Sequence, residues 1–320
     1  MLKSIYFTYH HVEKPWGGAN NFMRAFRGTI QETGEFTILD APSPDCDILF
    51  MNQLGRGPAQ GSGHYSLNEI KAMRGPKTRL IVRAINLRRH NPGYTLRTFF
   101  KNKRQDSKSL TLLHMADHVI FQSQYQKDMF MEYGYEGTSW SIIHNGAAAA
   151  FSPGEASSPL DGTLRILSCS FSKGLSKGHS LMARLSQCEG VELHYVGTWP
   201  DDVSPADIHL HGVLSAPEIA ALLKTVHYFF HPAVQDICPN VVCEALASGL
   251  PVIYNPKPGG TIELAVPTGI ALTEGNLQAM VRQACEGYED AARKTRKASP
   301  YYTIARALEE YTEVLRLYAR

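Results

Sequence analysis

Residues 231–253 read HPAVQDICPNVVCEALASGLPVI, and this stretch decides the fold of the chain. The run just before it, 226–231, is apolar and aromatic enough for a buried parallel strand. Pro239 can supply the fixed geometry of a first helical turn, and Gly249 is the residue type that commonly follows a helix end. Because 250–254 is apolar again, the segment predicts a strand, a loop, a helix and a second strand.

Two carboxylates stand eight positions apart in this segment. Asp236 falls in the loop at the carboxyl end of a strand, and Glu244 falls just inside the helix whose amides face the same crevice. Helix amides favour phosphate, and a carboxylate one turn inside can accept hydrogen bonds from the diol of a sugar or ribose. The spacing therefore predicts a nucleotide-sugar site, against the alternative of an ordinary loop acid and a partly exposed helix acid.

The segment resembles the family-4 (group 1) retaining glycosyltransferases of GT-B fold. Their signature is Glu-x7-Glu followed by Ala, two small residues, Gly, any residue and Pro-Val, and this chain has Asp in place of the first Glu. The resemblance implies that Glu244 binds the donor ribose and that Asp236 meets hydroxyls of the transferred sugar. The shorter Asp leaves the choice of sugar open.

A second resemblance lies after the first strand of the C-terminal half. Lys177-Gly178 before a helix is similar to the pyrophosphate-binding lysine of the family, and a cation there can offset charge on a leaving diphosphate. An Arg that many relatives carry upstream is replaced by Ser172 or Phe171, and Lys173 is a candidate substitute. A solvated surface lysine is the alternative for Lys177. With Lys177, Asp236 and Glu244 as catalytic candidates, the donor-binding candidates are Ser172, Lys173, Gly178, Gly197, Ile237, Cys238, Pro239, Asn240 and Val241.

The N-terminal half supplies weaker candidates for the acceptor and phosphate side. Gly17-Gly18 opens a helix, so its amides can approach an anion closely, although a plain turn is the alternative. Asn20 follows as a candidate for sugar or acceptor contact. Where many relatives place a sugar-contacting His, this chain offers Arg83 or Asn86, and a salt-bridged Arg at a strand end is equally compatible.

The chain as a whole alternates strands and helices twice. It has 320 residues, 43% hydrophobic and 19% charged, which suits two α/β domains. Six strands are expected in each half, and the helices of the first half are expected at 19–32, 66–73, 108–115 and 124–132. We predict an N-terminal Rossmann-like domain at 1–150 for the acceptor and a C-terminal one at 151–301 for the nucleotide sugar. The resemblance implies that they face each other across a cleft and that a helix at 302–320 crosses back onto the first.

The boundary is expected in the small-residue and proline-rich stretch 147–162. Just before it, Asn145-Gly146 completes an Ile-x-Asn-Gly motif that family-4 enzymes carry at the end of their first domain. An Asn-Gly turn at a strand end explains the pair equally well. We interpret it as a hinge and not as a catalytic element.

One basic run stands out, because residues 88–108 carry seven Lys and Arg against one Asp. With Phe99 and Phe100 inside it, the run suits an anionic membrane surface, an acidic glycan or plain solvent. Nucleic acid is not expected, since no recognised binding module accompanies the run.

The chain has no leader-like N-terminus and no apolar run of membrane-spanning length, which predicts a cytoplasmic protein, with the inner face of a membrane as an open alternative. Six scattered cysteines without a CxxC motif predict free thiols. Neither the acidic pairs nor the 13 histidines have ligand spacing, so no metal site is expected.

The resemblance implies a metal-independent retaining transfer of a hexose from a nucleoside-diphosphate sugar to a hydroxyl of a glycan, a lipid-linked acceptor or a small molecule. No separate cofactor is expected, and UDP, GDP and dTDP remain open, as does the oligomeric state. A GT-B epimerase acting on the donor and a non-catalytic nucleotide-sugar-binding protein are the alternative functions.

Overall fold

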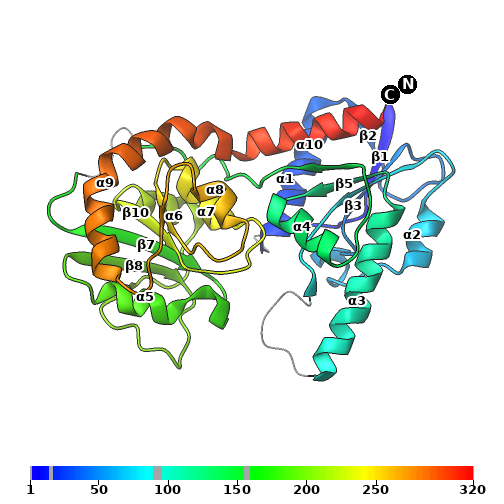
Figure 1. The fold of residues 1–320 in the computed structure, drawn as a ribbon. Helices are drawn as coiled ribbons and strands as arrows, with labels where there is room; N and C mark the ends of the chain where they lie inside the picture. The colour runs from blue at the N-terminus through cyan, green and yellow to red at the C-terminus, as the bar shows by residue number, and fades with distance from the viewer. Residues whose placement is uncertain (1, 14–16, 89–95, 155–158, 320) are drawn as a thin grey trace. The chain divides into compact units, whose positions relative to one another are not determined.

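The computed structural model describes residues 2–13, 17–88, 96–154 and 159–319. The chain divides into two compact units (Figure 1). Unit 1 consists of Met1–His144 and Ala307–Arg320, and unit 2 consists of Asn145–Arg306. The division at His144–Asn145 lies shortly before the linker expected at 147–162.

Unit 1 is built on a six-stranded parallel sheet in the order β2-β1-β3-β4-β5-β6. Its strands are β1 (Lys3–Phe7), β2 (Phe36–Ile38), β3 (Ile48–Asn52), β4 (Arg79–Arg83), β5 (His118–Phe121) and β6 (Trp140–Ile142). Its helices are α1 (Gly17–Thr33), α2 (Leu67–Met73), α3 (Leu96–Met115), α4 (Gln124–Glu132) and part of α10 (Ile304–Tyr318). The continuously buried β3 and β5 show that helices cover both faces of this sheet.

Unit 2 repeats the plan with the order β12-β11-β10-β7-β8-β9. Its strands are β7 (Leu164–Ser170), β8 (Val191–Gly197), β9 (His209–Leu210), β10 (Tyr228–His231), β11 (Val252–Tyr254) and β12 (Ile270–Ala271). Its helices are α5 (His179–Ser186), α6 (Ala216–Leu223), α7 (Asn240–Ala247), α8 (Thr261–Ala265) and α9 (Leu277–Ala298). One core lies between the sheet and α6, α7 and α8, and a second lies between the sheet and α5 and α9. The predicted α/β architecture with two parallel sheets is confirmed.

Helix α7, which carries Glu244, has well-defined ends. The expectation that Pro239 lies in its first turn is wrong by one position, because Pro239 has an extended backbone (φ −69°, ψ 121°) and caps a helix that begins at Asn240. Gly249 ends it with φ 77°, and the amides of Gly249 and Leu250 donate to the carbonyls of Leu246 and Ala245. This pair of bonds is the Schellman pattern, which directs the chain straight into β11.

The C-terminal helix α10 packs on unit 1 from Ala307 onward. Tyr311 is 1% exposed, and its ring centroid lies 4.7 Å from that of Phe22 and 5.4 Å from that of Phe26. Near the end of the helix, Arg316 donates to both oxygens of Glu35, at 2.7 and 2.6 Å. These contacts join the last residues of the chain to elements from its first 40 residues.

Helix α3 is longer than expected. The sequence predicts a helix at 108–115, but the helix begins at Leu96. Residues 98–104 are exposed or half-buried and so lack the apolar periodicity that identifies a packed helix. Among the described helices, none is both long enough and apolar enough to span a bilayer.

Candidate donor site in unit 2

The centre of the candidate site is an ion pair between two residues that are 59 positions apart. Lys177 follows β7 at the end of a short 3-10 turn, Leu175–Lys177, and Asp236 lies in the loop after β10. The Lys177 Nζ atom lies 2.9 and 2.8 Å from the two oxygens of Asp236. Because β7 and β10 are paired and parallel, their carboxyl ends bring the two loops together.

A second partner of Asp236, which sequence reasoning missed, is His231. Its Nε2 atom lies 3.3 Å from Oδ2 of Asp236, and its Nδ1 atom lies 3.1 Å from the hydroxyl of Thr261. His231 is 4% exposed, and its bonds to Thr261 and Asp236 hold the ring in one orientation. The sequence feature that could have identified His231 is its position as the last residue of the strand β10, because ligands bind at the carboxyl ends of strands in parallel sheets.

The neighbours of Asp236 favour the negatively charged form of its carboxyl group. Burial by itself would raise the pKa of Asp236, but the hydrogen bond and charge of His231 and the charge of Lys177 lower it to about 2. Asp236 is therefore ionised at every pH at which the protein would be assayed.

Backbone geometry fixes the Lys177 turn. Gly178 has φ 74°, and a Cβ atom at this position would lie 2.9 Å from the Cβ atom of Pro232. Only glycine avoids both the left-handed strain and the close approach to the loop after β10. The adjacent Ser176 carbonyl accepts from the amide of Val234, which ties the two loops together.

Glu244 lies in the second turn of α7 and is partly buried. Burial raises the pKa of its carboxyl to about 7, and no hydrogen-bond or ion-pair partner for it is found among the described residues. Its charge also contributes, after burial, to raising the pKa of Cys169 to about 12. Cys169 is the next-to-last residue of β7, the strand that precedes Lys177, and the side chains of Glu244 and Lys177 form no hydrogen bond or ion pair with each other.

A glycine loop lies against the Asp236 loop through its backbone. The amide of Gly260 donates to the Asp236 carbonyl at 2.7 Å, and the amide of Gln235 donates to the Pro258 carbonyl at 3.1 Å. Gln235 has φ 64°, an uncommon value for a residue other than glycine. The loop before α8 therefore holds Asp236 from the backbone side.

Asn145, which we interpret as a hinge residue, is attached to the site loop. Its side-chain amide donates to the carbonyl of Cys238 at 3.0 Å and to Oδ1 of Asn240 at 2.9 Å. Its backbone amide donates to Sγ of Cys238. The first residue of unit 2 thus orders the segment between Asp236 and α7, a link that sequence spacing could not reveal.

The other donor-side candidates take different positions. Lys173 is 44% exposed and pairs with Asp201 at 2.8 Å, so it does not join Lys177 at Asp236. The exposed Ser172 accepts from the amide of Gly174. Gly197 has φ 121°, and a Cβ atom there would lie 1.9 Å from the Ser170 carbonyl oxygen, so backbone conformation and packing together explain the glycine. Ile237 and Val241 are half-buried on either side of the Cys238–Asn240 segment.

A cavity of about 340 Å³ opens beside the Lys177 turn. Its walls come from the loops after β7, β8, β10 and β11 and from α5, and they include Lys173, Gly178 and Lys257. Lys177, Asp236 and Glu244 are not part of this lining. The cavity is therefore a neighbour of the ion pair and is distinct from it.

The candidates in unit 1 are held mainly by their own unit. Gly17 and Gly18 are exposed at the start of α1. Asn20 is fully buried and bonds the amide and the carbonyl of Val12, at 2.9 and 3.0 Å. Asn86 is half-buried in the loop after β4.

Arg83 is 3% exposed at the end of β4. It donates to Tyr311, Asn52 and Gln122 at 3.1, 2.9 and 2.6 Å, and it lies over the Phe22 ring. Arg83 therefore has three hydrogen-bond partners within unit 1, and through Tyr311 it helps to hold α10 on that unit.

Within the described residues, no group of three or more His, Cys, Asp or Glu side chains is arranged to hold a metal ion.

The segment that contains this site is similar to a known protein family. Residues 173–290 match the family model described as "Glycosyl transferases group 1", a span that includes Lys177, Asp236 and Glu244. No curated protein sequence matches the chain significantly.

Solved structures resemble the whole chain. Sucrose-phosphate synthase from Thermosynechococcus elongatus superposes with a TM-score of 0.73 at 12% identity, covering 99% of both chains. Anabaena HepE in complex with UDP-glucose gives 0.66 at 17% identity, covering 99% of this chain and 100% of HepE. WaaG, described as a glycosyltransferase of lipopolysaccharide biosynthesis, gives 0.65 at 13% identity over 97% and 99%. The fold is GT-B, and within unit 2 residues 173–290 match the group 1 glycosyltransferase family model.

Proposed function

We propose that this protein, whose second unit matches the group 1 glycosyltransferase family model over residues 173–290, transfers a hexose from a nucleoside-diphosphate sugar to an acceptor hydroxyl with retention of configuration. The observation that carries the proposal is the pairing of Lys177 with Asp236 beside a helix in which the Glu244 carboxylate has no hydrogen-bond or ion-pair partner among the described residues. A cation for the diphosphate and a carboxylate for a diol are the two functions that a nucleotide-sugar donor requires.

In this proposal Lys177 carries the diphosphate. Its position next to Asp236 keeps the ammonium group inside the site before the donor arrives. When the sugar–phosphate bond breaks, negative charge grows on the leaving phosphate, and a fixed cation stabilises that charge more in the transition state than in the ground state. Asp236, fixed by His231, then faces the hydroxyls of the transferred sugar.

The retaining outcome is proposed to follow a front-face route. Asp236 is already engaged by Lys177 and His231, which makes it a poor covalent nucleophile. Instead, the leaving phosphate oxygen takes the proton of the acceptor hydroxyl as that hydroxyl attacks the same face of the sugar. A sugar ester trapped on Asp236 and detected by mass spectrometry would contradict this route.

The direct test is a thermal-shift screen against UDP-, GDP- and dTDP-sugars. HepE was crystallised with UDP-glucose, so this donor is the first choice. A ligand present at 100 times its dissociation constant stabilises the folded state by about 2.7 kcal/mol. Incubation of the best donor without acceptor then separates the alternatives, because an epimerase would release an isomerised donor and a binding protein would leave the donor unchanged with or without acceptor.

Donor binding is expected to depend on pH through Glu244. The pKa of its carboxyl is about 7 in the free protein, and hydrogen bonds from ribose hydroxyls favour the ionised form. Binding should therefore release a proton, so that affinity rises with pH and levels off above about pH 7. Below about pH 7 the affinity for the donor should fall by about tenfold for each pH unit. Calorimetry in two buffers of different ionisation enthalpy counts the released protons.

The matched control is Glu244→Gln, which keeps the shape of the side chain and cannot ionise. This variant should bind the donor about 10- to 100-fold more weakly at pH 8, because a hydrogen bond to a charged group is worth about 1.5–3 kcal/mol. Its affinity should be independent of pH between about pH 6 and pH 8. Equal pH dependence in both proteins would show that another group titrates and that Glu244 does not meet the donor.

A further inference from the structure

The first half of α3 stands apart from the core of unit 1. Residues 98–101, 103 and 104 are exposed, whereas the buried face of the helix begins at Asp106 and continues through Ser109 and Leu112. In Figure 1 the start of α3 extends beyond the sheet of its own unit. The side chains of this half are therefore available to a partner.

The charged side chains that the structure describes in this half are all positive. Lys101, Lys103 and Arg104 form no ion pair with any described residue, and no acid occurs between positions 98 and 105. Asp106, the nearest acid, is 1% exposed and accepts from the amide of Arg88 at 2.8 Å. An unbalanced positive surface of this kind attracts an anionic partner.

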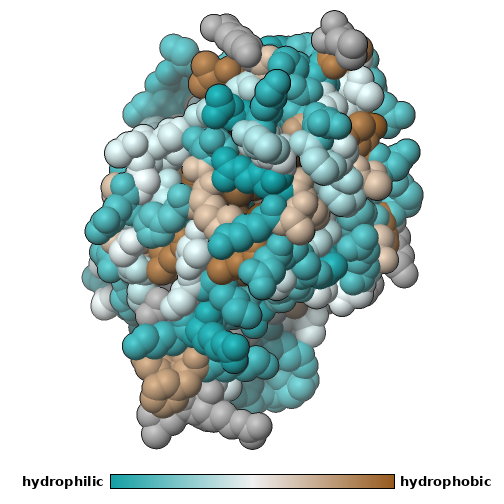
Figure 2. Space-filling model, turned by 90° about the vertical axis from the view of Figure 1, so that its right-hand side faces the viewer, coloured by the Kyte–Doolittle hydropathy of each residue, from teal (hydrophilic) through white to brown (hydrophobic). Residues whose placement is uncertain are grey.

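Two aromatic rings occupy the same exposed surface. Phe99 is 41% exposed and Phe100 is 67% exposed, and their rings meet edge to face at 5.7 Å. Residues 100, 103, 104 and 107 share one helix face, so Phe100 lies directly beside Lys103 and Arg104. Figure 2 shows an apolar patch at this lower end of the molecule with hydrophilic residues above it.

We propose that the exposed half of α3, residues 98–108, binds an anionic lipid surface. Phenylalanine at the headgroup boundary gains an apolar environment while the neighbouring cations stay at the level of the lipid phosphates. An acidic glycan would satisfy the cations but offers no apolar phase for Phe100. A nucleic acid is not favoured, because no recognised binding module accompanies these residues.

The experiment is flotation of the full chain with phosphatidylcholine vesicles prepared with and without phosphatidylglycerol. The protein should float only with the anionic vesicles and should be released at about 0.5 M NaCl, where surface charges are screened. Lys103→Glu/Arg104→Glu should lower the vesicle affinity at least about tenfold. Phe99→Ser/Phe100→Ser should lower it by about three- to tenfold, because the apolar contribution is lost.

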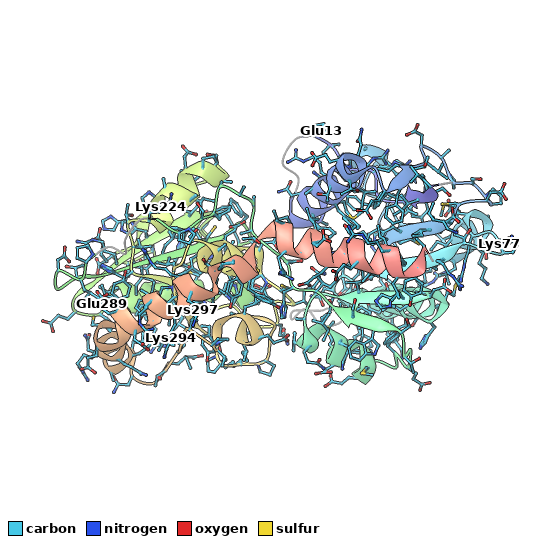
Figure 3. All side chains as sticks on the ribbon, turned by 90° about the horizontal axis from the view of Figure 1, so that it is seen from above. Glu13, Lys77, Lys224, Glu289, Lys294 and Lys297 are labelled. Atoms are coloured by element: carbon cyan, nitrogen blue, oxygen red, sulfur yellow. The ribbon has the colours of Figure 1, made fainter. Side chains whose placement is uncertain are left out.

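The matched control is Lys71→Glu/Lys77→Glu, which reverses two exposed charges elsewhere on unit 1; Lys77 points outward in Figure 3. It changes the net charge equally and should keep wild-type vesicle binding. All variants should keep the circular dichroism spectrum and the melting temperature of the parent protein. Failure to float with anionic vesicles, an equal loss in the control, or binding to heparin but not to vesicles would each overturn the proposal. None of these measurements requires the proposed transfer reaction.

Discussion

Replacement of Lys177 with alanine is expected to lower kcat by about 10²- to 10³-fold, the usual cost of removing one group that stabilises developing negative charge. Lys177 is the cation paired with Asp236, and 24% of its side chain is exposed, so a donor phosphate can reach it. The substitution removes the charge and also leaves the Asp236 carboxylate without its ammonium partner. Steady-state kinetics with the donor selected by thermal shift measure the effect.

The control for Lys177 is Lys297→Ala, an exposed lysine of α9 labelled in Figure 3, which should retain wild-type kinetics. The drop in kcat should exceed the accompanying rise in KM, because the interaction already present with the bound donor strengthens in the transition state. If Lys177→Ala kept more than about one third of the wild-type kcat, the assigned role of Lys177 would be wrong.

Truncation of Tyr311 to alanine is expected to destabilise unit 1 by about 3–5 kcal/mol, the range found for buried aromatic residues. Tyr311 attaches the C-terminal helix through the Phe22 and Phe26 rings, and its hydroxyl accepts from Arg83. The loss combines a cavity in an aromatic cluster with a buried guanidinium left short of one acceptor. Urea denaturation followed by tryptophan fluorescence and circular dichroism measures the change.

Two variants of the same helix divide this effect into its parts. Tyr311→Phe keeps the ring contacts and removes only the hydroxyl, which accepts from Arg83, so it should cost about 1–3 kcal/mol. Leu317→Ala alters a side chain that is 55% exposed and should stay within about 0.5 kcal/mol of the parent. Comparable losses in Tyr311→Ala and Leu317→Ala would mean that the helix is not held by the aromatic cluster.

The fold was predictable from the sequence because most of its elements carry clear local signals. Buried parallel strands such as Tyr228–His231 are continuous apolar runs, and Gly249 marks the end of α7. The first half of α3 has no such signal, since its exposed Lys, Arg and Phe residues follow no apolar period. Its helicity depends on good helix formers and on continuity with the packed second half.

The site was predictable in its residue types but not in its pairings. The spacing of Asp236 and Glu244 predicts two carboxylates at the end of one strand. It cannot show that Lys177, from a loop 59 positions away, forms an ion pair with Asp236. His231 was missed as a partner of Asp236, and Asn145 was interpreted only as a hinge, because hydrogen bonds across loops leave no period in the sequence. Asn20 illustrates the converse, since a polar side chain beside a glycine pair is used to hold its own loop.

The central claim is that unit 2 grips one nucleotide-sugar donor with both Lys177 and Glu244. Calorimetric titration of the donor into the parent protein, Lys177→Ala, Glu244→Gln and the double variant tests it most directly. We predict that each single substitution weakens binding at pH 8 by at least about tenfold, as expected for the loss of a charge-assisted contact, and that the double variant binds more weakly still. Donor binding that is unchanged in both single variants would contradict the account.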